Sequence, residues 1–81
     1  MLAKIYVTLK NGVLDPQGKA VKHSLATLGF NEVMDVRIGK FIELKLGKVS
    51  KSEAEAHVKD MCEKLLANTV IESYRFEVIE N

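Results

Sequence analysis

The amino-acid sequence predicts an α+β fold: a two-layer sandwich in which two helices cover one face of a small β-sheet. Three stretches of alternating apolar and polar residues, 3–9, 33–46 and 70–80, indicate strands. Two stretches with apolar residues at helical spacing, 16–28 and 51–67, lie between them. The order is strand, helix, long bent strand, helix, strand. Packing both helices on one face is the most economical way to bury their apolar sides.

The length and composition place the chain among small globular domains. We expect one domain over residues 1–81, and 47% hydrophobic residues argue against disorder. Twelve Lys and Arg against eleven Asp and Glu leave a formal charge of +1, which does not favour a nucleic-acid partner. A single cysteine excludes an internal disulfide and a cysteine-rich metal site. No apolar run suits a membrane span or a signal peptide, so we expect a cytoplasmic protein.

The first strand leads through a short turn into the first helix. In this strand, the side chains expected on the buried face are Ala3, Ile5, Val7 and Leu9. Asp15 is placed to cap the helix by accepting backbone N–H bonds, and Pro16 fits the first helical position because its missing donor would be unpaired there. Gly12 is expected to supply an unusual backbone angle in the turn. Gly29 is expected to end the helix in the left-handed conformation.

The helix start around Asp15 combines glycines and lysines as a phosphate-binding loop does. The spacing does not match, because five residues separate Gly12 from Gly18, and Lys19 is followed by Ala20 instead of a hydroxyl residue. The Asp15 carboxylate would also occupy the place of a phosphate at the helix N-terminus. We therefore interpret this stretch as a structural cap.

The third element is expected to be one long strand, residues 33–46, bent or bulged at Gly39. A two-residue hairpin turn at Gly39 and Lys40 would instead place Glu43 and Lys45 on the apolar side. The alternation continues through the glycine without a slip, which favours one strand. Such a strand would be roughly 45 Å long, whereas a compact domain of this size is about 30 Å across. One end should project and pair, most simply with a second copy of the chain.

The second helix and the last strand carry clear patterns of their own. Ser50 and Glu53 form a capping box at the helix start, and Asn68 is expected to follow its end. The stripe expected to be buried is Ala54, Val58, Met61, Cys62 and Leu65. In the last strand, the side chains expected on one face are Tyr74, Phe76 and Val78.

The residues indicate no catalytic constellation, cofactor loop or metal site. His23 and His57 have no base or ligand partner at suitable spacing, and Cys62 on the apolar stripe is interpreted as a core residue. Arg37 and Lys40 flank the central glycine of the long strand. They form either a solvated outer face or a basic spot for a subunit contact, and both interpretations stay open. These residues favour a binding or assembly module.

Two segments carry a resemblance to a known family. Residues 10–18, "KNGVLDPQG", and residues 36–40, "VRIGK", together with the closing "YRFEVIE", resemble the PurS family. PurS is the small subunit of phosphoribosylformylglycinamidine synthase in purine biosynthesis. The resemblance implies a subunit with no catalytic residues or cofactor of its own. It also implies that the subunit bridges a glutaminase subunit and an ATP-dependent synthetase subunit, and that it associates with itself as a homodimer or a dimer of dimers.

The physical rationale for such an adaptor is the chemistry of ammonia. Ammonia that escapes into neutral water becomes ammonium and is no longer a nucleophile, so the relay between two enzymes needs a closed path. A small rigid subunit that binds both partners can supply it through assembly alone. Two segments combine unusual backbone residues with basic groups that lie outside any core stripe, so we expect them to contribute to subunit contacts. The predicted subunit-interface residues are Asn11, Gly12, Val13, Leu14, Asp15, Pro16, Arg37, Gly39 and Lys40.

Two other classes of function are compatible with the sequence. A dimeric regulatory domain that senses a small molecule is the alternative, because the predicted fold by itself does not exclude it. Binding of glutamine, ATP or ADP by the isolated chain would distinguish a sensor from an adaptor. A nucleic-acid binder is the third class, and the near-neutral charge argues against it.

Overall fold

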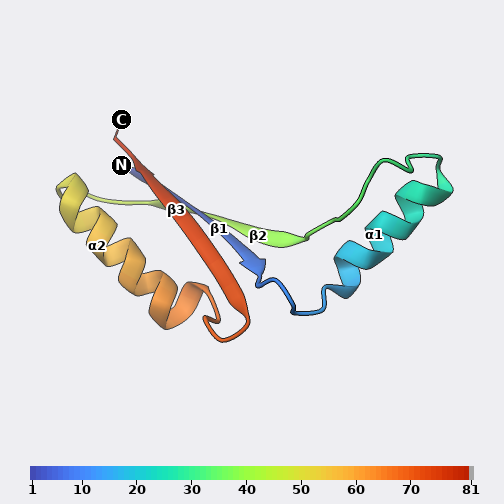
Figure 1. Cartoon of the computed structure of the whole chain (residues 1–81). Helices are drawn as coiled ribbons and strands as arrows, with labels where there is room; N and C mark the ends of the chain where they lie inside the picture. The colour runs from blue at the N-terminus through green and yellow to red at the C-terminus, as the bar shows by residue number, and fades with distance from the viewer. Residues whose placement is uncertain (81) are drawn as a thin grey trace.

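The computed structural model describes residues 1–80 and confirms an α+β chain with a small sheet and two helices (Figure 1). Its elements are β1 (Leu2–Leu9), α1 (Pro16–Thr27), β2 (Gly39–Lys45), α2 (Lys51–Met61), a π-helical turn η1 (Cys62–Leu66) and β3 (Glu72–Ile79). The three strands form one antiparallel sheet in the order β2-β1-β3. The first strand of the chain is therefore the central one, which pairs along both edges.

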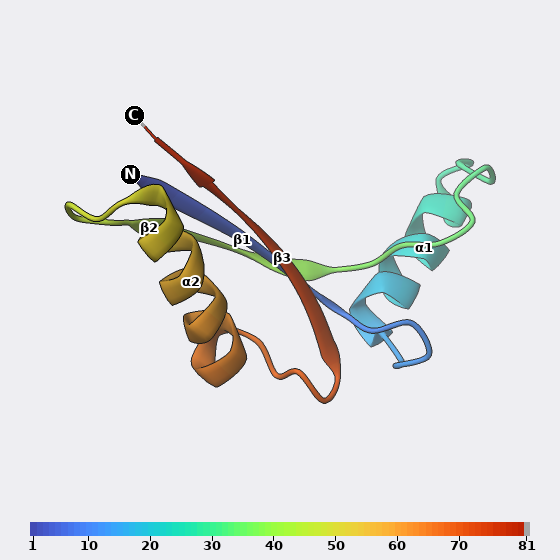
Figure 2. The ribbon, with the colours of Figure 1, turned by 60° about the vertical axis from the view of Figure 1, so that its left-hand side comes forward.

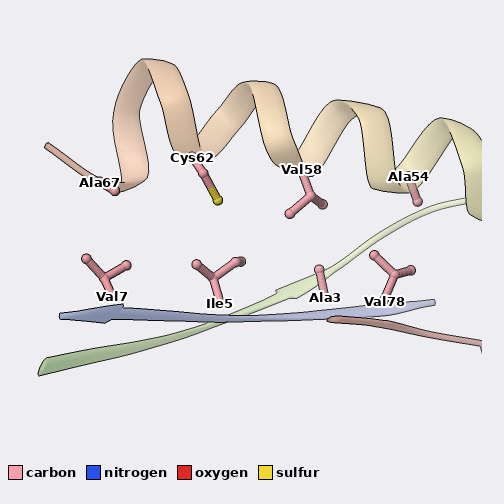
Figure 3. Packing of buried hydrophobic residues seen from close by; sticks show 8 residues of the cluster. All are labelled: Ala3, Ile5, Val7, Ala54, Val58, Cys62, Ala67 and Val78. Carbon is pink, nitrogen blue, oxygen red and sulfur yellow. The ribbon is translucent and has the colours of Figure 1, made fainter. Parts of the chain in front are cut away.

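The core lies between one face of the sheet and α2, as Figure 3 shows. Ile5 in the middle of β1 is paired with Ile42 on one side and Phe76 on the other. Side chains alternate between the two faces of a strand. The residues of β2 and β3 that pair with buried residues of β1 therefore point to the same face of the sheet. The buried hydrophobic residues are Ala3, Ile5, Val7, Ala54, Val58, Cys62, Ala67 and Val78. This core is thin, as expected for so short a chain.

The end of the second helix differs from the sequence prediction. The backbone N–H of Ala67 donates to the Cys62 carbonyl oxygen at 3.1 Å, five residues back, which is the π-helical pattern. This wider turn moves the apolar stripe by one residue. Leu66 packs against the core, whereas Leu65 is 81% exposed and Met61 is also exposed. The prediction that Met61 and Leu65 are buried is therefore wrong.

The first helix does not lie on the sheet. Figures 1 and 2 show α1 projecting beyond one end of the strands, on the other side of the molecule from α2. Within α1 only Gly18 is buried, and Leu25 is half-buried. The prediction that both helices cover one face is therefore wrong for α1. The chain turns away after Leu9, and the close contact of α1 at Gly18 is with the segment that returns to β2.

The second strand is shorter than the sequence predicts. Pairing with β1 begins with Gly39 opposite Thr8, and β1 ends one residue later at Leu9. Residues 33–38 therefore extend past the end of their partner strand and form no strand in the described chain. The single strand predicted for residues 33–46 is wrong before Gly39, and Gly39, where a bend or bulge was predicted, is the first residue of β2.

Local signals for the helix ends are confirmed. The backbone N–H of Glu53 donates to the Ser50 hydroxyl oxygen at 3.2 Å, and Gly29 has a φ of +99° after α1.

A side-chain hydrogen bond joins β3 to η1, where the Tyr74 hydroxyl donates to a Glu63 carboxylate oxygen at 2.6 Å. This hydrogen bond raises the pKa of Tyr74 to about 12, since losing the phenolic proton would place two negative charges together.

Candidate assembly site

Two segments that are far apart in the sequence meet at the base of α1. They form a hydrogen-bonded cluster of Asp15, Gly18, Arg37 and Ile38, which we call the clasp. One oxygen of the Asp15 carboxylate accepts from the Gly18 N–H at 2.8 Å, and the other accepts from the Ile38 N–H at 2.9 Å. Asp15 is only 6% exposed. One side chain thus caps α1 and ties it to the residue that precedes β2.

The Arg37 side chain makes the second half of the clasp. Its guanidinium donates to the carbonyl oxygens of Leu9 and Lys10, the latter at 2.9 Å. Leu9 is the last residue of the central strand, so Arg37 attaches the returning segment to the end of the sheet. Hydrogen bonds from a charged donor are stronger than those between neutral groups. The guanidinium therefore has an internal structural role, beside any contact that it makes with another subunit.

Glycines allow the close approaches within this region. A Cβ at Gly18 would collide with the Val36 carbonyl oxygen and lie 2.9 Å from a carboxylate oxygen of Asp15. A Cβ at Gly39 would collide with the Val7 carbonyl oxygen. Gly12 is required for its backbone conformation, because residues with a Cβ rarely adopt its φ of +88°. The turn, the helix start and the strand start each depend on one glycine.

The Asp15 carboxyl titrates below its ordinary range. The hydrogen bonds from Gly18 and Ile38 lower its pKa, and the charge of Arg37 lowers it further, because all three favour the ionised form. The clasp is therefore held by a carboxylate at neutral pH.

We expect the clasp to lose stability in acid. Since the folded-state pKa of Asp15 is lower than the unfolded value, its contribution is present above about pH 4 and is lost as the pH falls through the folded-state pKa. Urea unfolding of the wild type and of Asp15→Asn at neutral and acidic pH measures this. The wild type should be the more stable at neutral pH, and the difference should shrink in acid. A difference that stays constant with pH would contradict the assignment.

The other predicted interface residues surround the clasp. Leu14 is 62% exposed, Asn11 and Pro16 are exposed, and Val13 is half-buried. Lys40 lies at the start of β2, where its ammonium group is 3.5 Å from a carboxylate oxygen of Glu72 on β3. The structure therefore brings the two predicted segments to one end of the sheet.

Gly18 and Ile38 are members of the clasp that are absent from the predicted set. Gly18 lies three residues after the cap, at the position from which a backbone N–H reaches an N-cap side chain, so the sequence contained a signal for it. Ile38 takes part through its backbone N–H, and the type of residue at a position does not reveal such a role.

The sheet face opposite α2 carries a second cluster. The rings of Tyr6 and Phe41 lie with centroids 5.1 Å apart, and the Arg75 guanidinium is 3.9 Å from the Tyr6 centroid. The Tyr6 hydroxyl also donates to Glu77 at 3.3 Å. An open groove of about 420 Å³ runs beside these side chains. Alternation along β1 already places Tyr6 on the side opposite Ile5.

The remaining reactive side chains are placed as follows. Cys62 is buried in the core, as expected, and its desolvation raises the pKa of the thiol. His23 is exposed on α1. Within residues 1–80, no three His, Cys, Asp or Glu side chains gather in a way that could hold a metal ion. None of the helices in this range has the length and apolar character needed to cross a membrane.

The antiparallel sheet, the covering helix α2 and the projecting helix α1 held by the clasp define the class, a small α+β protein with one helix held away from its own sheet. The family model described as phosphoribosylformylglycinamidine (FGAM) synthase, PurS, matches residues 2–80. The chain is 61% identical over 77 residues to the FGAM synthase subunit PurS of Bacillus subtilis, covering 95% of this chain and 90% of that protein. The chain belongs to the PurS family.

Solved structures show the same likeness. The B. subtilis PurS structure has a TM-score of 0.84 at 59% identity and covers 98% of both chains. A chain in the PurLQS structure from Thermotoga maritima has a TM-score of 0.83 at 32% identity, covering 98% of this chain and 99% of that one. The projecting position of α1 is thus part of an overall arrangement similar to that of solved PurS chains.

Proposed function

We propose that this chain is the PurS subunit of FGAM synthase in purine biosynthesis, and that it acts by assembly, with no catalytic residue or cofactor of its own. The observation that carries the proposal is its likeness, over nearly the whole chain, to a chain of the PurLQS complex. The partners would be a glutaminase subunit and an ATP-dependent synthetase subunit, together with further copies of this chain. The complex would work in the cytoplasm.

The geometry is suited to an adaptor. The clasp sets the direction of α1 through hydrogen bonds from two backbone N–H groups to one carboxylate, so α1 leaves the sheet at a defined angle. An element held in this way can contact a partner without a large loss of conformational freedom on binding. Ammonia passed between two active sites has to stay unprotonated, and an adaptor that holds both subunits together keeps the path short and closed.

Substitution of the clasp provides the test. We expect Arg37→Ala, and Asp15→Ala combined with Pro16→Ala, to weaken assembly with the two enzyme subunits at least about tenfold, because α1 would lose its fixed direction and would have to be ordered on binding. Glutamine-dependent FGAM formation, measured in the reconstituted complex, should fall at limiting subunit concentration. Formation from ammonium salt at alkaline pH should fall less, since free ammonia bypasses the relay.

Lys59→Ala is the matched control, because Lys59 is exposed on α2, away from both α1 and the clasp. It should leave both activities unchanged. If both clasp variants assemble and retain full glutamine-dependent activity, the assignment of these residues to the interface is wrong.

The sensing alternative has a separate test. The groove beside Tyr6 and Phe41 is the place on the described surface where a small molecule would be sought first. Titration calorimetry of the isolated chain against glutamine, ATP and ADP should give no binding heat for an adaptor. Tight binding of any of the three by the chain alone would favour a sensor.

A further inference from the structure

The turn that joins β1 to α1 (Figure 1) contains an asparagine that directly precedes a glycine, Asn11 before Gly12. Asparagine is a thermolabile residue, because the backbone nitrogen of the next residue can attack its side-chain carbonyl carbon and displace the amide group. A side chain on that next residue hinders the approach, so glycine allows it most readily. The other asparagines are followed by a residue with a side chain or stand last in the sequence: Asn31, Asn68 and Asn81. The sequence therefore singles out Asn11 as the reactive asparagine.

The structure leaves the reacting groups accessible to solvent. Asn11 and Gly12 are both exposed, and an open depression of about 280 Å³ borders Gly12. Within residues 1–80, no hydrogen bond holds the Asn11 side chain or occupies the Gly12 N–H. The Asn68 side chain, by contrast, accepts from the Val70 N–H at 3.2 Å. The attacking nitrogen and the carbon that it attacks are therefore open to water at Asn11.

The turn around Asn11 is closed by one backbone hydrogen bond. The Val13 N–H donates to the Lys10 carbonyl oxygen at 3.1 Å, with Asn11 and Gly12 at the two central positions. The φ of Gly12 is +88°, a positive value that the second central residue of a type II turn adopts. Opening an exposed turn of this kind costs far less free energy than global unfolding. The folded chain can therefore rotate Asn11 into the geometry of attack.

We propose that Asn11 is a site of spontaneous deamidation and that the reaction opens the clasp. The Gly12 nitrogen forms a bond to Cγ of Asn11, the bond from Cγ to the amide nitrogen breaks, and ammonia leaves with the proton that the Gly12 nitrogen gives up. Water then adds to one of the two carbonyl carbons of the succinimide ring. Opening of the ring on one side gives aspartate, and opening on the other gives isoaspartate. Water is the only co-reactant, and nothing is oxidised or reduced.

The position of the turn connects this reaction to the clasp. The Lys10 carbonyl oxygen accepts from the Val13 N–H at 3.1 Å and from the Arg37 guanidinium at 2.9 Å. Isoaspartate adds a carbon atom to the main chain between Lys10 and Val13, so the turn no longer closes. The new carboxylate also competes with the Lys10 carbonyl oxygen for the guanidinium, because a charged acceptor binds arginine more strongly. Both effects release Arg37, and with it the segment that precedes β2.

The reaction also has a consequence for assembly, and this consequence alone rests on the proposed function. Asn11 belongs to the predicted interface, so a deamidated chain should assemble less well with the two enzyme subunits, since α1 would have to be ordered on binding. Bound subunits should in turn cover the turn and slow the loss of the amide. The deamidation itself depends on the turn and would occur in the isolated chain.

Peptide mapping by mass spectrometry of the full chain, after incubation in mildly alkaline buffer, tests the site. We expect Asn11 to lose its amide at least about tenfold faster than Asn31 or Asn68, because a side chain on the following residue raises the barrier to attack at those two positions. Asn31 is the matched internal control, since it is exposed as Asn11 is. Both aspartate and isoaspartate should appear at position 11. Equal rates at Asn11 and Asn31 would overturn the proposal.

Amide exchange at Ile38 measures the effect on the clasp. In the isoaspartate fraction, separated by chromatography, the Ile38 N–H should exchange faster than in the unreacted chain. Asn11→Ser has no amide to lose, so its protection at Ile38 should survive the same incubation. Unchanged protection in the isoaspartate fraction, or equal loss in Asn11→Ser, would overturn the link to the clasp. The two proposals can fail separately. A chain that deamidates at Asn11 but never supports FGAM formation would refute the function, and an active subunit that keeps its Asn11 amide when isolated would refute this inference.

Discussion

Ile5→Ala is expected to lower the free energy of unfolding by about 3 kcal/mol, within the range for deleting most of a buried isoleucine and leaving a cavity. Ile5 is fully buried at the centre of the middle strand, where Ile42 and Phe76 flank it and α2 lies above it (Figure 3). A chain of this length has a total stability of roughly 4–12 kcal/mol. The substitution should therefore remove a large part of the stability, because few other buried side chains share the core.

Urea unfolding followed by circular dichroism measures this effect. Leu65→Ala is the control, since that leucine is exposed and the sequence pattern alone would have placed it in the core. Its effect should stay within about 0.5 kcal/mol, as for surface substitutions in general. Equal losses from the two substitutions would show that the π-helical turn does not direct Leu66 inward in place of Leu65.

Gly18→Ala is expected to destabilise the clasp, although alanine in place of glycine within a helix usually stabilises by about 0.5–1 kcal/mol. The added methyl group would collide with the Val36 carbonyl oxygen and approach the Asp15 carboxylate to 2.9 Å. The backbone of the returning segment would have to move, at a cost of about 1–3 kcal/mol for an overpacked site. That movement would break the hydrogen bond from Ile38 to Asp15.

Amide exchange at Ile38 is the direct readout, because its N–H should lose protection when the clasp opens. Gly47→Ala is the matched control: a Cβ there meets no atom within 4 Å, and its backbone is compatible with alanine. The control should leave exchange at Ile38 unchanged. Retained protection in Gly18→Ala would mean that the clasp tolerates a side chain at that position.

Features that depend on a few neighbouring residues were predicted well. Asp15 caps α1, Pro16 occupies the first helical turn, and Ser50 caps α2, because each of these roles involves groups at most three residues away. Alternation identified β1 and β3, since the side-chain period of a strand is a local property. The family resemblance rested on such local segments as well.

The periodicity gave the wrong result at two places. Residues 33–38 have the alternation of a strand, but a strand needs a neighbour, and β1 ends at Leu9. Leu65 has the spacing of a regular helix, but the Ala67 N–H donates to the Cys62 carbonyl oxygen five residues back, and this π-helical turn places Leu66 toward the core instead. A missing partner strand decided the first outcome, and a change of helix type decided the second.

The sequence by itself indicated three strands and two helices in the observed order, the helix caps, and the resemblance to the PurS family. Only the tertiary structure showed that α1 leaves the sheet, and that Asp15 joins α1 to Ile38 while Arg37 joins the same segment to Leu9. The physical reason is one of range. Caps and periodicity follow from groups a few residues apart. In the clasp, the side chains of Asp15 and Arg37 reach backbone N–H and C=O groups more than twenty positions away, and every residue carries such groups.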